Sequence, residues 1–462
     1  MIALKASEIA KIVGGELIGG DITVTAAPAF NSSQATEGSI FLALVGEKTD
    51  GHKFVSDAFA HGAVLAFVTS EVSERCIVVK DVLAALNSLA YHVRQALPEL
   101  KVIALTGSQG KTTTKDLLRH ILETVAPTVA PAGNFNNELG SPITLLQCDE
   151  KTRFCILEMG ARHVGDIAKL CKMATPDIGV VLRVGTAHVG EFGSEELVAK
   201  AKSEMISSLS DSAISVLGQY DQYTPAMASL HNGTTVTFGE TNNADVRATD
   251  IEIREGRPHF DLVTPAGRAS VALRIIGIHQ VANALAAAAI ATNLNISIDL
   301  IAGALSTAEL HSKWRMDISE LDGLVLINDS YNSSPESAEA ALRTLVLFAQ
   351  ERGGQSWAFL GKMHELGASS PQHHSRLGTL ASELGIDHLV CVGSPEYAAQ
   401  INGSGATTVH LFDSKESAAE LVSQMSEGDV VLVKASRAEK FEEVADLIVE
   451  KWNSREVGER VK

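Results

Sequence analysis

Short apolar runs and amphipathic stretches alternate along the chain. Runs of strand length, such as residues 39–45, 64–69 and 76–79, are followed by stretches like 82–97, in which apolar residues recur every three or four positions. The first pattern predicts strands, and the second is typical of helices that bury one face. Strands separated by helices at this spacing predict βαβ units and parallel sheets. We therefore predict an α/β fold.

The pattern breaks near residue 98 and again near residue 311. Pro98-Glu-Leu-Lys101 interrupts the helical period just before a new strand, which is typical of a boundary between domains. We predict three domains: a small N-terminal α/β domain (1–98), a central P-loop ATPase-like domain with a parallel sheet (99–311), and a C-terminal Rossmann-like α/β domain (312–462). A chain of 462 residues is long enough for three such cores.

Further elements are expected inside the second and third domains. The central domain should contain strands at 154–159 and 178–184, an acidic helix at 194–209, and an alanine-rich helix at 281–293 that packs on the main sheet. Three alternating segments in the same domain predict an antiparallel β patch: 234–238, 246–254 and 269–273. The third domain should alternate strands at 324–328, 357–361, 388–392 and 430–434 with helices at 336–349, 373–384, 415–425 and 440–452.

The most informative stretch follows an apolar strand at 101–105. It reads Thr106-Gly107-Ser108-Gln-Gly110-Lys111-Thr112-Thr113-Thr114, and a helical pattern comes after it. Glycines let backbone N–H groups approach an anion, and the start of a helix adds partial positive charge. Lys111 would reach the terminal phosphates and the Thr112 hydroxyl would face Mg²⁺. The strict P-loop has more residues between its glycines, so an ordinary turn is the alternative, but the strand–turn–helix context favours an ATP site.

Composition narrows the functional class. The net charge is −18, which argues against a nucleic-acid partner. The five cysteines are odd in number and widely spaced, which fits reduced thiols better than disulfides or a zinc site. Met1–Val13 lacks the apolar core of a signal peptide, and no apolar tract is long enough to span a bilayer. We expect a cytoplasmic protein without membrane insertion, and a monomer.

Four further side chains are candidates, each with a bland alternative. Glu158 ends an apolar strand and could supply an oxygen ligand to Mg²⁺, or be an exposed strand-end residue. His188 follows the next strand among glycines, yet a lone histidine there is more often a surface or packing residue. Lys202 reads as a solvated helix lysine. Asp329 lies in a polar turn before Pro335, and a ligand site and an ordinary turn are equally compatible with it.

Together these motifs resemble the Mur ligases, in which the phosphate loop is shortened in the same way. The likeness extends over all three predicted domains. It is carried by motifs that follow in the family's order: 106–114, 134–140 (Asn-Phe-Asn-Asn-Glu-Leu-Gly), 158–162 (Glu-Met-Gly-Ala-Arg), 187–194 (Ala-His-Val-Gly-Glu-Phe-Gly-Ser), 277–283 (Gly-Ile-His-Gln-Val-Ala-Asn), 328–332 (Asn-Asp-Ser-Tyr-Asn), 363–367 (Met-His-Glu-Leu-Gly) and 434–437 (Lys-Ala-Ser-Arg). It is closest to the members that join D-alanyl-D-alanine to UDP-N-acetylmuramoyl-tripeptide, although Ser33 stands where the family usually has arginine.

The resemblance implies a role for each candidate residue. Lys111, His188 and Lys202 would be catalytic, and Lys202 matches the lysine that the family carbamylates with CO₂. Two Mg²⁺ ions would be held by Thr112, Glu158, His188 and the carbamate of Lys202. ATP would bind Gly107, Ser108, Gly110, Lys111, Thr112, Thr113, Asn283, Arg315 and Asp329. The two other substrates would contact Ser32, Asn136, Asn137, Tyr331 and Asn332.

The implied reaction is an ATP-dependent amide ligation through an acyl phosphate. Residues 1–98 would bind the UDP sugar, 99–311 ATP, and 312–462 ATP and the incoming dipeptide. Two alternatives from the sequence stay open: a related ligase with another acceptor, such as a folylpolyglutamate-type enzyme, and a P-loop ATPase that drives a conformational change. A non-catalytic binding protein is disfavoured because the phosphate and metal set is intact.

Overall fold

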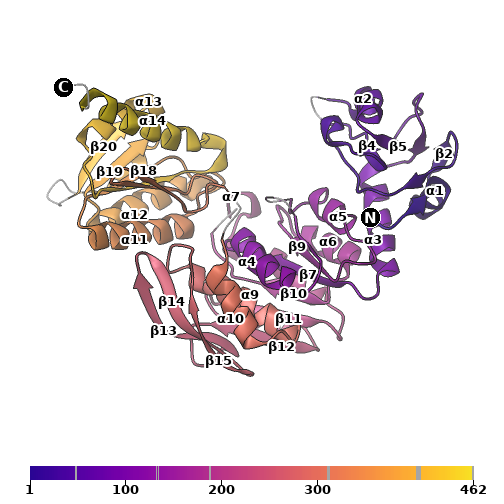
Figure 1. The fold of residues 1–462 in the computed structure, drawn as a ribbon, viewed down its shortest axis with the longest axis horizontal. Coiled ribbons are helices and arrows are strands. Elements are labelled where there is room, and N and C mark those ends of the chain that lie inside the picture. The colour runs from indigo at the N-terminus through magenta and orange to yellow at the C-terminus, as the bar shows by residue number, and fades with distance from the viewer. Residues whose placement is uncertain are drawn as a thin grey trace.

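The chain forms three lobes arranged in an arc, each built round its own sheet (Figure 1). The computed structural model describes residues 1–46, 49–131, 133, 135–186, 189–309, 313–401 and 407–459, with side chains as far as residue 455. The N-terminal and C-terminal lobes stand at the two ends of the arc, and the central lobe joins them. This arrangement confirms the predicted α/β fold in three parts.

The N-terminal lobe contains a four-stranded sheet in the order β2-β6-β5-β4, in which only β2 is antiparallel to its neighbour. Helix α3 packs on α1 of this lobe and on α5 and α6 of the central lobe, so it carries the contact between them. The elements are β1 (Leu4–Lys5), α1 (Ala6–Val13), β2 (Glu16–Ile18), β3 (Thr23–Val24), β4 (Ser39–Leu42), α2 (Val55–Ala60), β5 (Ala63–Val68), β6 (Cys76–Val78) and α3 (Val82–Ala96).

The central lobe contains a nine-stranded sheet in the order β15-β14-β13-β12-β11-β10-β7-β9-β8. Strands β8 to β12 run parallel, and β7 lies between β9 and β10, where an unbroken apolar run is buried on both faces. The elements are β7 (Lys101–Thr106), α4 (Lys111–Glu123), β8 (Thr128–Val129), α5 (Gly140–Leu145), β9 (Phe154–Glu158), α6 (Asp166–Ala174), β10 (Ile178–Val181), α7 (Val189–Phe192), α8 (Glu195–Ser207), β11 (Ile214–Gly218), β12 (Thr234–Gly239), β13 (Val246–Arg254), β14 (Arg257–Thr264), β15 (Gly267–Ala272), α9 (Gln280–Asn293) and α10 (Ile298–Thr307).

The alanine-rich helix α9 packs on α4 and on the strands β11 to β14, as the sequence predicts. Every residue from Asn283 to Ala291 is buried. Small side chains allow this close approach of helix and sheet, and the burial of so much apolar surface is the main source of stability there.

The predicted antiparallel patch is partly wrong. Strand β12 runs parallel to β11 and to β13, so it belongs to the parallel part of the sheet. Only β13, β14 and β15 form an antiparallel meander. Strand β14 was not expected, because Pro258 near its start reads as a strand breaker.

The C-terminal lobe contains a six-stranded sheet in the order β16-β17-β21-β18-β19-β20, parallel except for the edge strand β16. Helix α11 faces the central lobe, and the four predicted strands are all present. The elements are β16 (Asp317–Leu321), β17 (Leu324–Asn328), α11 (Pro335–Arg352), β18 (Ser356–Leu360), α12 (Ser370–Glu383), β19 (His388–Val392), β20 (Thr408–Phe412), α13 (Lys415–Ala419), β21 (Val430–Lys434) and α14 (Glu442–Glu459).

Candidate active site

The phosphate loop lies at the carboxyl end of β7, and only glycine fits two of its positions. Gly110 has φ +84, and a Cβ there would lie 2.4 Å from Asn283 Oδ1. A Cβ on Gly107 would lie 2.9 Å from the Cβ of Leu182. The backbone N–H of Ser108 donates to the carbonyl of Arg183 at 2.9 Å, which ties the loop to the end of the neighbouring strand β10. The loop is thus a fixed turn that opens onto the start of α4.

Lys111 begins α4 and is partly buried inside this turn. Its Nζ donates to the carbonyl of Gly107 at 2.6 Å. Desolvation lowers the pKa of Lys111; the Glu158 carboxylate opposes this shift and Arg315 adds to it. A desolvated cation beside the first N–H groups of a helix makes a strong site for an anion.

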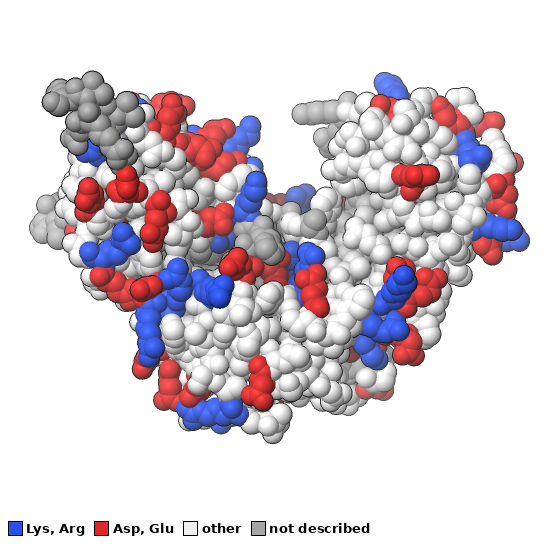
Figure 2. Space-filling model, in the orientation of Figure 1, with Lys and Arg blue, Asp and Glu red and all other residues white. Residues whose placement is uncertain are grey.

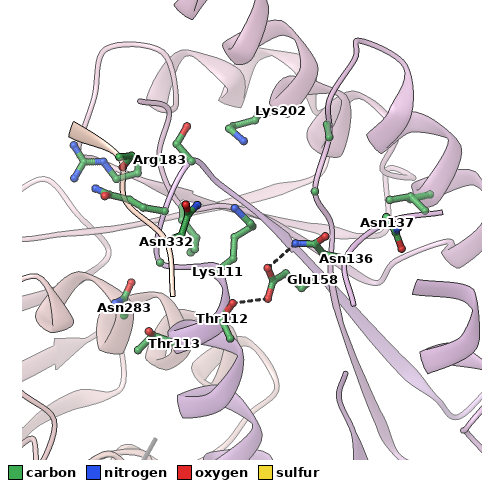
Figure 3. Close-up of a pocket in the computed structure, with 18 of the residues that line it drawn as sticks. Lys111, Thr112, Thr113, Asn136, Asn137, Glu158, Arg183, Lys202, Asn283 and Asn332 are labelled. Carbon is green, nitrogen blue, oxygen red and sulfur yellow. Dashed lines mark hydrogen bonds between the residues drawn. The ribbon is translucent and has the colours of Figure 1, made fainter. Parts of the chain in front are cut away.

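Glu158 ends β9 next to the loop, and hydrogen bonds hold both of its oxygens (Figure 3). Thr112 Oγ1 donates to Oε2 at 2.9 Å, and Asn136 Nδ2 donates to Oε1 at 3.0 Å. Glu158 is 2% exposed, so the carboxylate is not the solvated strand-end residue that the bland alternative expects. A buried carboxylate with a hydroxyl at its side offers the hard oxygen atoms that Mg²⁺ prefers.

Lys202 is buried on α8, which contradicts its interpretation as a solvated lysine. It is 5% exposed and lies on the same face as Val198 and Ile206, one helical turn away on either side. Among the described residues, none forms a hydrogen bond or ion pair with it. Burial, and then the charge of Lys111, lower the pKa of Lys202 well below its usual value. Figure 3 shows its amine turned towards Lys111.

His188 lies outside the described residues, so its predicted metal role stays a prediction. Thr186, just before it, donates from its N–H and hydroxyl to Glu336 Oε1 at 2.6 and 2.8 Å, which links this loop to the C-terminal lobe. Within the described part of the chain, no three histidine, cysteine or acidic side chains converge to form a metal site.

Asn283, one of the predicted ATP-binding residues, lies against the phosphate loop from helix α9. Its Oδ1 accepts from Thr114 Oγ1 at 3.4 Å, and its Nδ2 donates to Gln280 Oε1 at 2.8 Å. Thr113 is buried next to this contact, and Figure 3 shows Asn283 and Thr113 on the opposite side of Lys111 from Lys202.

The C-terminal lobe brings the remaining candidates to the same cavity. The Cζ of Arg315 lies 3.9 Å from the centre of the Tyr331 ring, and its Nε is buried without a hydrogen-bond partner. Asp329 Oδ2 is 2.5 Å from the Nζ of Lys434, which also donates to the carbonyl of Asn332 at 2.9 Å. Asp329 is thus part of a buried ion pair and not of an ordinary exposed turn.

Two predicted substrate residues differ from the rest. The side-chain oxygen of Asn137 accepts from Gly140 N at 2.9 Å and so caps helix α5, although Asn137 also lines the cavity. Ser32 lies in a turn of the N-terminal lobe and does not line the cavity. Its contact with a substrate stays a prediction.

One cavity of about 2090 Å³ joins Lys111, Glu158, Lys202, Asn283 and Asp329, and residues of all three lobes line it. Phe30 is one of the residues of the N-terminal lobe that line the cavity. It forms an edge-to-face contact with Phe135 of the central lobe, with ring centres 6.2 Å apart. Figure 2 shows the hollow between the two end lobes, above the central one. The volume exceeds that of a drug-sized ligand pocket, so the cavity has room for more than one substrate.

Arg183, His279 and Lys434 also line this cavity but are not among the site residues predicted from the sequence. Arg183 has an Nε buried without a partner and stands at the loop's edge, and no surrounding pattern marks it. Burial lowers the pKa of His279 to about 4; Asp329 opposes this shift and Lys434 adds to it. The motifs 277–283 and 434–437 contain His279 and Lys434, so the resemblance could have found these two.

Comparison with known proteins gives consistent matches along the chain. The Mur ligase middle domain matches residues 105–291, and the Mur ligase, glutamate ligase domain, matches residues 314–437. A Mycobacterium tuberculosis protein named UDP-N-acetylmuramoyl-tripeptide–D-alanyl-D-alanine ligase is 38% identical, over 97% of this chain and 98% of that protein.

Solved structures agree with this. The crystal structure of MurF from Acinetobacter baumannii is 33% identical with a TM-score of 0.89, covering 97% of this chain and 99% of its own. MurF ligase from Thermotoga maritima, in complex with ADP, is 30% identical with a TM-score of 0.82, covering 93% of this chain and 99% of its own.

Among the described residues, no helix is long and apolar enough to cross a membrane.

Proposed function

We propose a reaction from the premise that this chain belongs to the Mur ligase family, with a relative 38% identical along 97% of its length. The chain joins D-alanyl-D-alanine to UDP-N-acetylmuramoyl-tripeptide at the expense of ATP. The products are the UDP-muramoyl-pentapeptide, ADP and phosphate. Within this scheme residues 1–98 bind the UDP sugar, 99–311 bind ATP, and 312–462 complete the ATP site and bind the dipeptide.

The observation that carries this proposal is the position of Glu158 and Lys202 on either side of Lys111 in one cavity (Figure 3). A simple ATPase needs a phosphate loop, to which Lys111 belongs, and a bound cation, which the Glu158 carboxylate would hold. A ligase also needs room beside the terminal phosphate for a carboxylate and an amine. The cavity supplies that room, and its lining extends from Phe30 to Arg315, in different lobes.

The chemistry proceeds in two steps. A carboxylate is a poor electrophile, so an oxygen of the tripeptide carboxylate attacks the γ-phosphorus of ATP, the bond to the bridging oxygen breaks, and ADP leaves. The amine of the dipeptide then attacks the acyl carbon and loses a proton, and the tetrahedral intermediate expels phosphate. Lys111 and the N-terminus of α4 stabilise negative charge on the transferring phosphoryl group.

The nucleotide fits the loop because Gly110 leaves no side chain between the α4 N-terminus and the cavity. Gly107, Ser108, Lys111, Thr112 and Thr113 would contact the phosphates. Asn283 would face the adenine, and Arg315 and Asp329 would reach the nucleotide from the C-terminal lobe. Asn136, Asn137, Tyr331 and Asn332 line the same cavity and would contact the other substrates, with Ser32 further out.

Magnesium fits the oxygen atoms at the end of β9. Glu158 and Thr112 would hold it, together with His188. When bound, Mg²⁺ would act as a Lewis acid that neutralises charge on the phosphate oxygens. Glu158 is already oriented for this by the hydrogen bonds from Thr112 and Asn136.

Lys202 would complete the metal site as a carbamate. An ammonium there would repel a cation, whereas a buried amine with a lowered pKa and without a partner among the described residues can react with CO₂. Its nitrogen attacks the carbon of CO₂, a C–N bond forms and a proton leaves, which gives an anionic oxygen ligand. Incubation with isotopically labelled bicarbonate, followed by NMR, should give a carbamate signal that Lys202→Ala lacks. A signal that persists in this variant would contradict the assignment.

Product analysis tests the reaction itself. Mass spectrometry of a mixture with ATP, UDP-N-acetylmuramoyl-tripeptide and D-alanyl-D-alanine should detect the pentapeptide product only when all three are present. ATP hydrolysis that ignores both other substrates would instead support the ATPase alternative. Product formed with glutamate in place of the dipeptide would support the folylpolyglutamate-type alternative.

A further inference from the structure

A second buried lysine on α4, Lys115, takes no part in the proposed chemistry. Lys115 lies one helical turn after Lys111, and its side chain is only 3% exposed. Its three N–H groups have three acceptors: Asp116 Oδ1 at 2.9 Å, the carbonyl of Pro131 at 3.0 Å and the carbonyl of Gly133 at 3.3 Å. Two of the three are backbone atoms of a segment that follows β8 and precedes α5. Lys115 therefore ties this segment to α4.

The segment leads directly to Asn136, whose amide holds Glu158. The Glu158 carboxylate accepts from Thr112 on one oxygen and from Asn136 on the other. Thr112 belongs to α4 itself, and Asn136 is connected to α4 through the carbonyls that Lys115 holds. Both supports of the carboxylate thus depend on the same helix, which also carries the phosphate-binding lysine.

The other end of the segment has its own supports. The carbonyl of Asn136 accepts from Gly160 N at 2.7 Å, and Asn137 caps α5. These bonds fix where the segment continues after Asn136. Among the described side chains, Lys115 is the one that donates to the carbonyls of Pro131 and Gly133.

Stability alone does not account for a buried lysine at this position. Taking an ammonium out of water is costly, and the interactions it gains in the interior repay that cost only where their geometry is good. What an apolar side chain cannot do is hold two carbonyl groups at defined positions. The hydrogen bonds of Lys115 therefore fix the positions of the Pro131 and Gly133 carbonyls.

We propose that Lys115 is a positioning residue for the cation site: it holds the carbonyls of Pro131 and Gly133, and so sets where the chain brings the Asn136 amide to the Glu158 carboxylate. The inference rests on the proposed role of Glu158 as a cation ligand. Partners that orient a metal ligand without touching the metal typically cost 10- to 100-fold in metal affinity or activity when removed, so a loss of about that size is expected here.

The test measures cation binding directly, so that it does not depend on ligation. Mn²⁺ serves as the probe, and its free concentration is followed by electron paramagnetic resonance in the presence of ADP. Lys115→Met should weaken Mn²⁺ binding by up to about 10- to 100-fold, and its melting temperature should fall as well, because the carbonyl of the buried Pro131 loses this donor. Lys115→Arg should restore much of the affinity, because a guanidinium can also donate to two carbonyls.

Arg119→Met is the matched control. Arg119 is one turn further along α4, is exposed, and pairs with Glu123 at 2.7 Å. The Arg119→Met variant also removes a cation from α4, but Arg119 does not donate to Pro131 or Gly133. Its Mn²⁺ affinity should equal that of the wild type.

A double-mutant cycle with Asn136→Ala identifies the route. If Lys115 acts through Asn136, the double variant should bind Mn²⁺ no more weakly than Asn136→Ala alone. Additive losses would overturn the proposed route. Wild-type Mn²⁺ affinity in folded Lys115→Met would overturn the proposal as a whole, as would weak binding that Lys115→Arg does not restore. Should Lys115→Met fail to fold, Lys115→Arg and Asn136→Ala still decide between these outcomes.

Discussion

At the scale of single residues, the site depends on lysines that are buried in a chain whose net charge is −18. The sequence could place Lys111, because its neighbours form a recognisable turn, but it suggested a solvated Lys202. On α8 the buried face contains Val198, Lys202 and Ile206 at intervals of four, and one lysine in such a row is the signal that could have been noticed. Arg183 offered no comparable signal, because only the fold brings it to the loop.

Substitution of Lys202 by alanine should abolish ligation and leave ATP binding nearly unchanged. The carbamate is expected to act on the metal and not on the adenine side of the cavity. Turnover and fluorescent-nucleotide binding measure the two effects separately. Lys200→Ala, which removes an exposed lysine from the same helix, is the control. Near-normal turnover in Lys202→Ala would contradict the role assigned to this side chain.

The pH dependence of stability should report the buried imidazole of His279. Its pKa falls from 6.5 to about 4 in the folded protein. Because the unfolded chain binds the proton more readily, His279 contributes stability above about pH 6.5, and this contribution is lost as the pH falls through about 4.

Melting temperatures measured between pH 6.5 and about pH 4 test this contribution of His279 to stability. The wild type should lose more stability than His279→Gln as the pH falls, because carboxylates titrate equally in both. His92→Gln removes an exposed histidine and should behave as the wild type. Parallel curves for the wild type and His279→Gln would show that the buried imidazole does not titrate as expected.

At the scale of elements, the structure agrees best with the predicted secondary structure around the phosphate loop. The run β7, the glycine turn and α4 were predictable because an apolar strand, φ-permissive residues and an amphipathic helix follow one another without interruption. Strand β16 was missed although Asp322-Gly323, with φ of +38 and +92, is a strong hairpin signal before β17. Strand β14 was missed because pairing with β13 and β15 outweighs the local effect of Pro258.

The junction of the loop with α4 should not tolerate a side chain. In Gly110→Ala the new Cβ would approach Asn283 Oδ1 at 2.4 Å in a left-handed conformation. We expect the KM for ATP to rise by about tenfold or more, since strained backbone of this kind costs of order 1–3 kcal/mol. Gly303→Ala, in α10 with open space around its Cβ position, should leave the KM unchanged. Unaltered kinetics in Gly110→Ala would show that the loop is not held as described.

At the scale of the whole molecule, the two end lobes are attached differently. Arg94 of α3 donates to Asp177 Oδ2 at 2.9 Å and to the carbonyls of Ala174 and Thr175, which anchors the N-terminal lobe to the central one. The C-terminal lobe is linked to the central one through glutamates that accept from it, as in Gly256 N to Glu351 Oε2 at 3.0 Å and Thr186 N to Glu336 Oε1 at 2.6 Å. No local sequence pattern predicts these contacts, because they join residues that are far apart in the chain.

Substrates should draw the C-terminal lobe towards the other two. Arg315 and Asp329 are proposed to bind a nucleotide whose phosphates are held by the central lobe, so binding would favour a closed arrangement. Small-angle scattering with a non-hydrolysable ATP analogue and UDP-N-acetylmuramoyl-tripeptide should show a smaller radius of gyration than the free protein. An unchanged radius would argue against lobe closure.

The most direct test of ligation through an acyl phosphate is to trace an oxygen atom from the tripeptide carboxylate into the released phosphate. UDP-N-acetylmuramoyl-tripeptide labelled with a heavy oxygen isotope in its terminal carboxylate is mixed with ATP, D-alanyl-D-alanine and the protein, and the released phosphate is analysed by mass spectrometry. Ligation through an acyl phosphate predicts that one labelled oxygen appears in each phosphate, together with the pentapeptide product. Unlabelled phosphate, released at the same rate without the dipeptide, would mean that the protein hydrolyses ATP and does not form the amide bond.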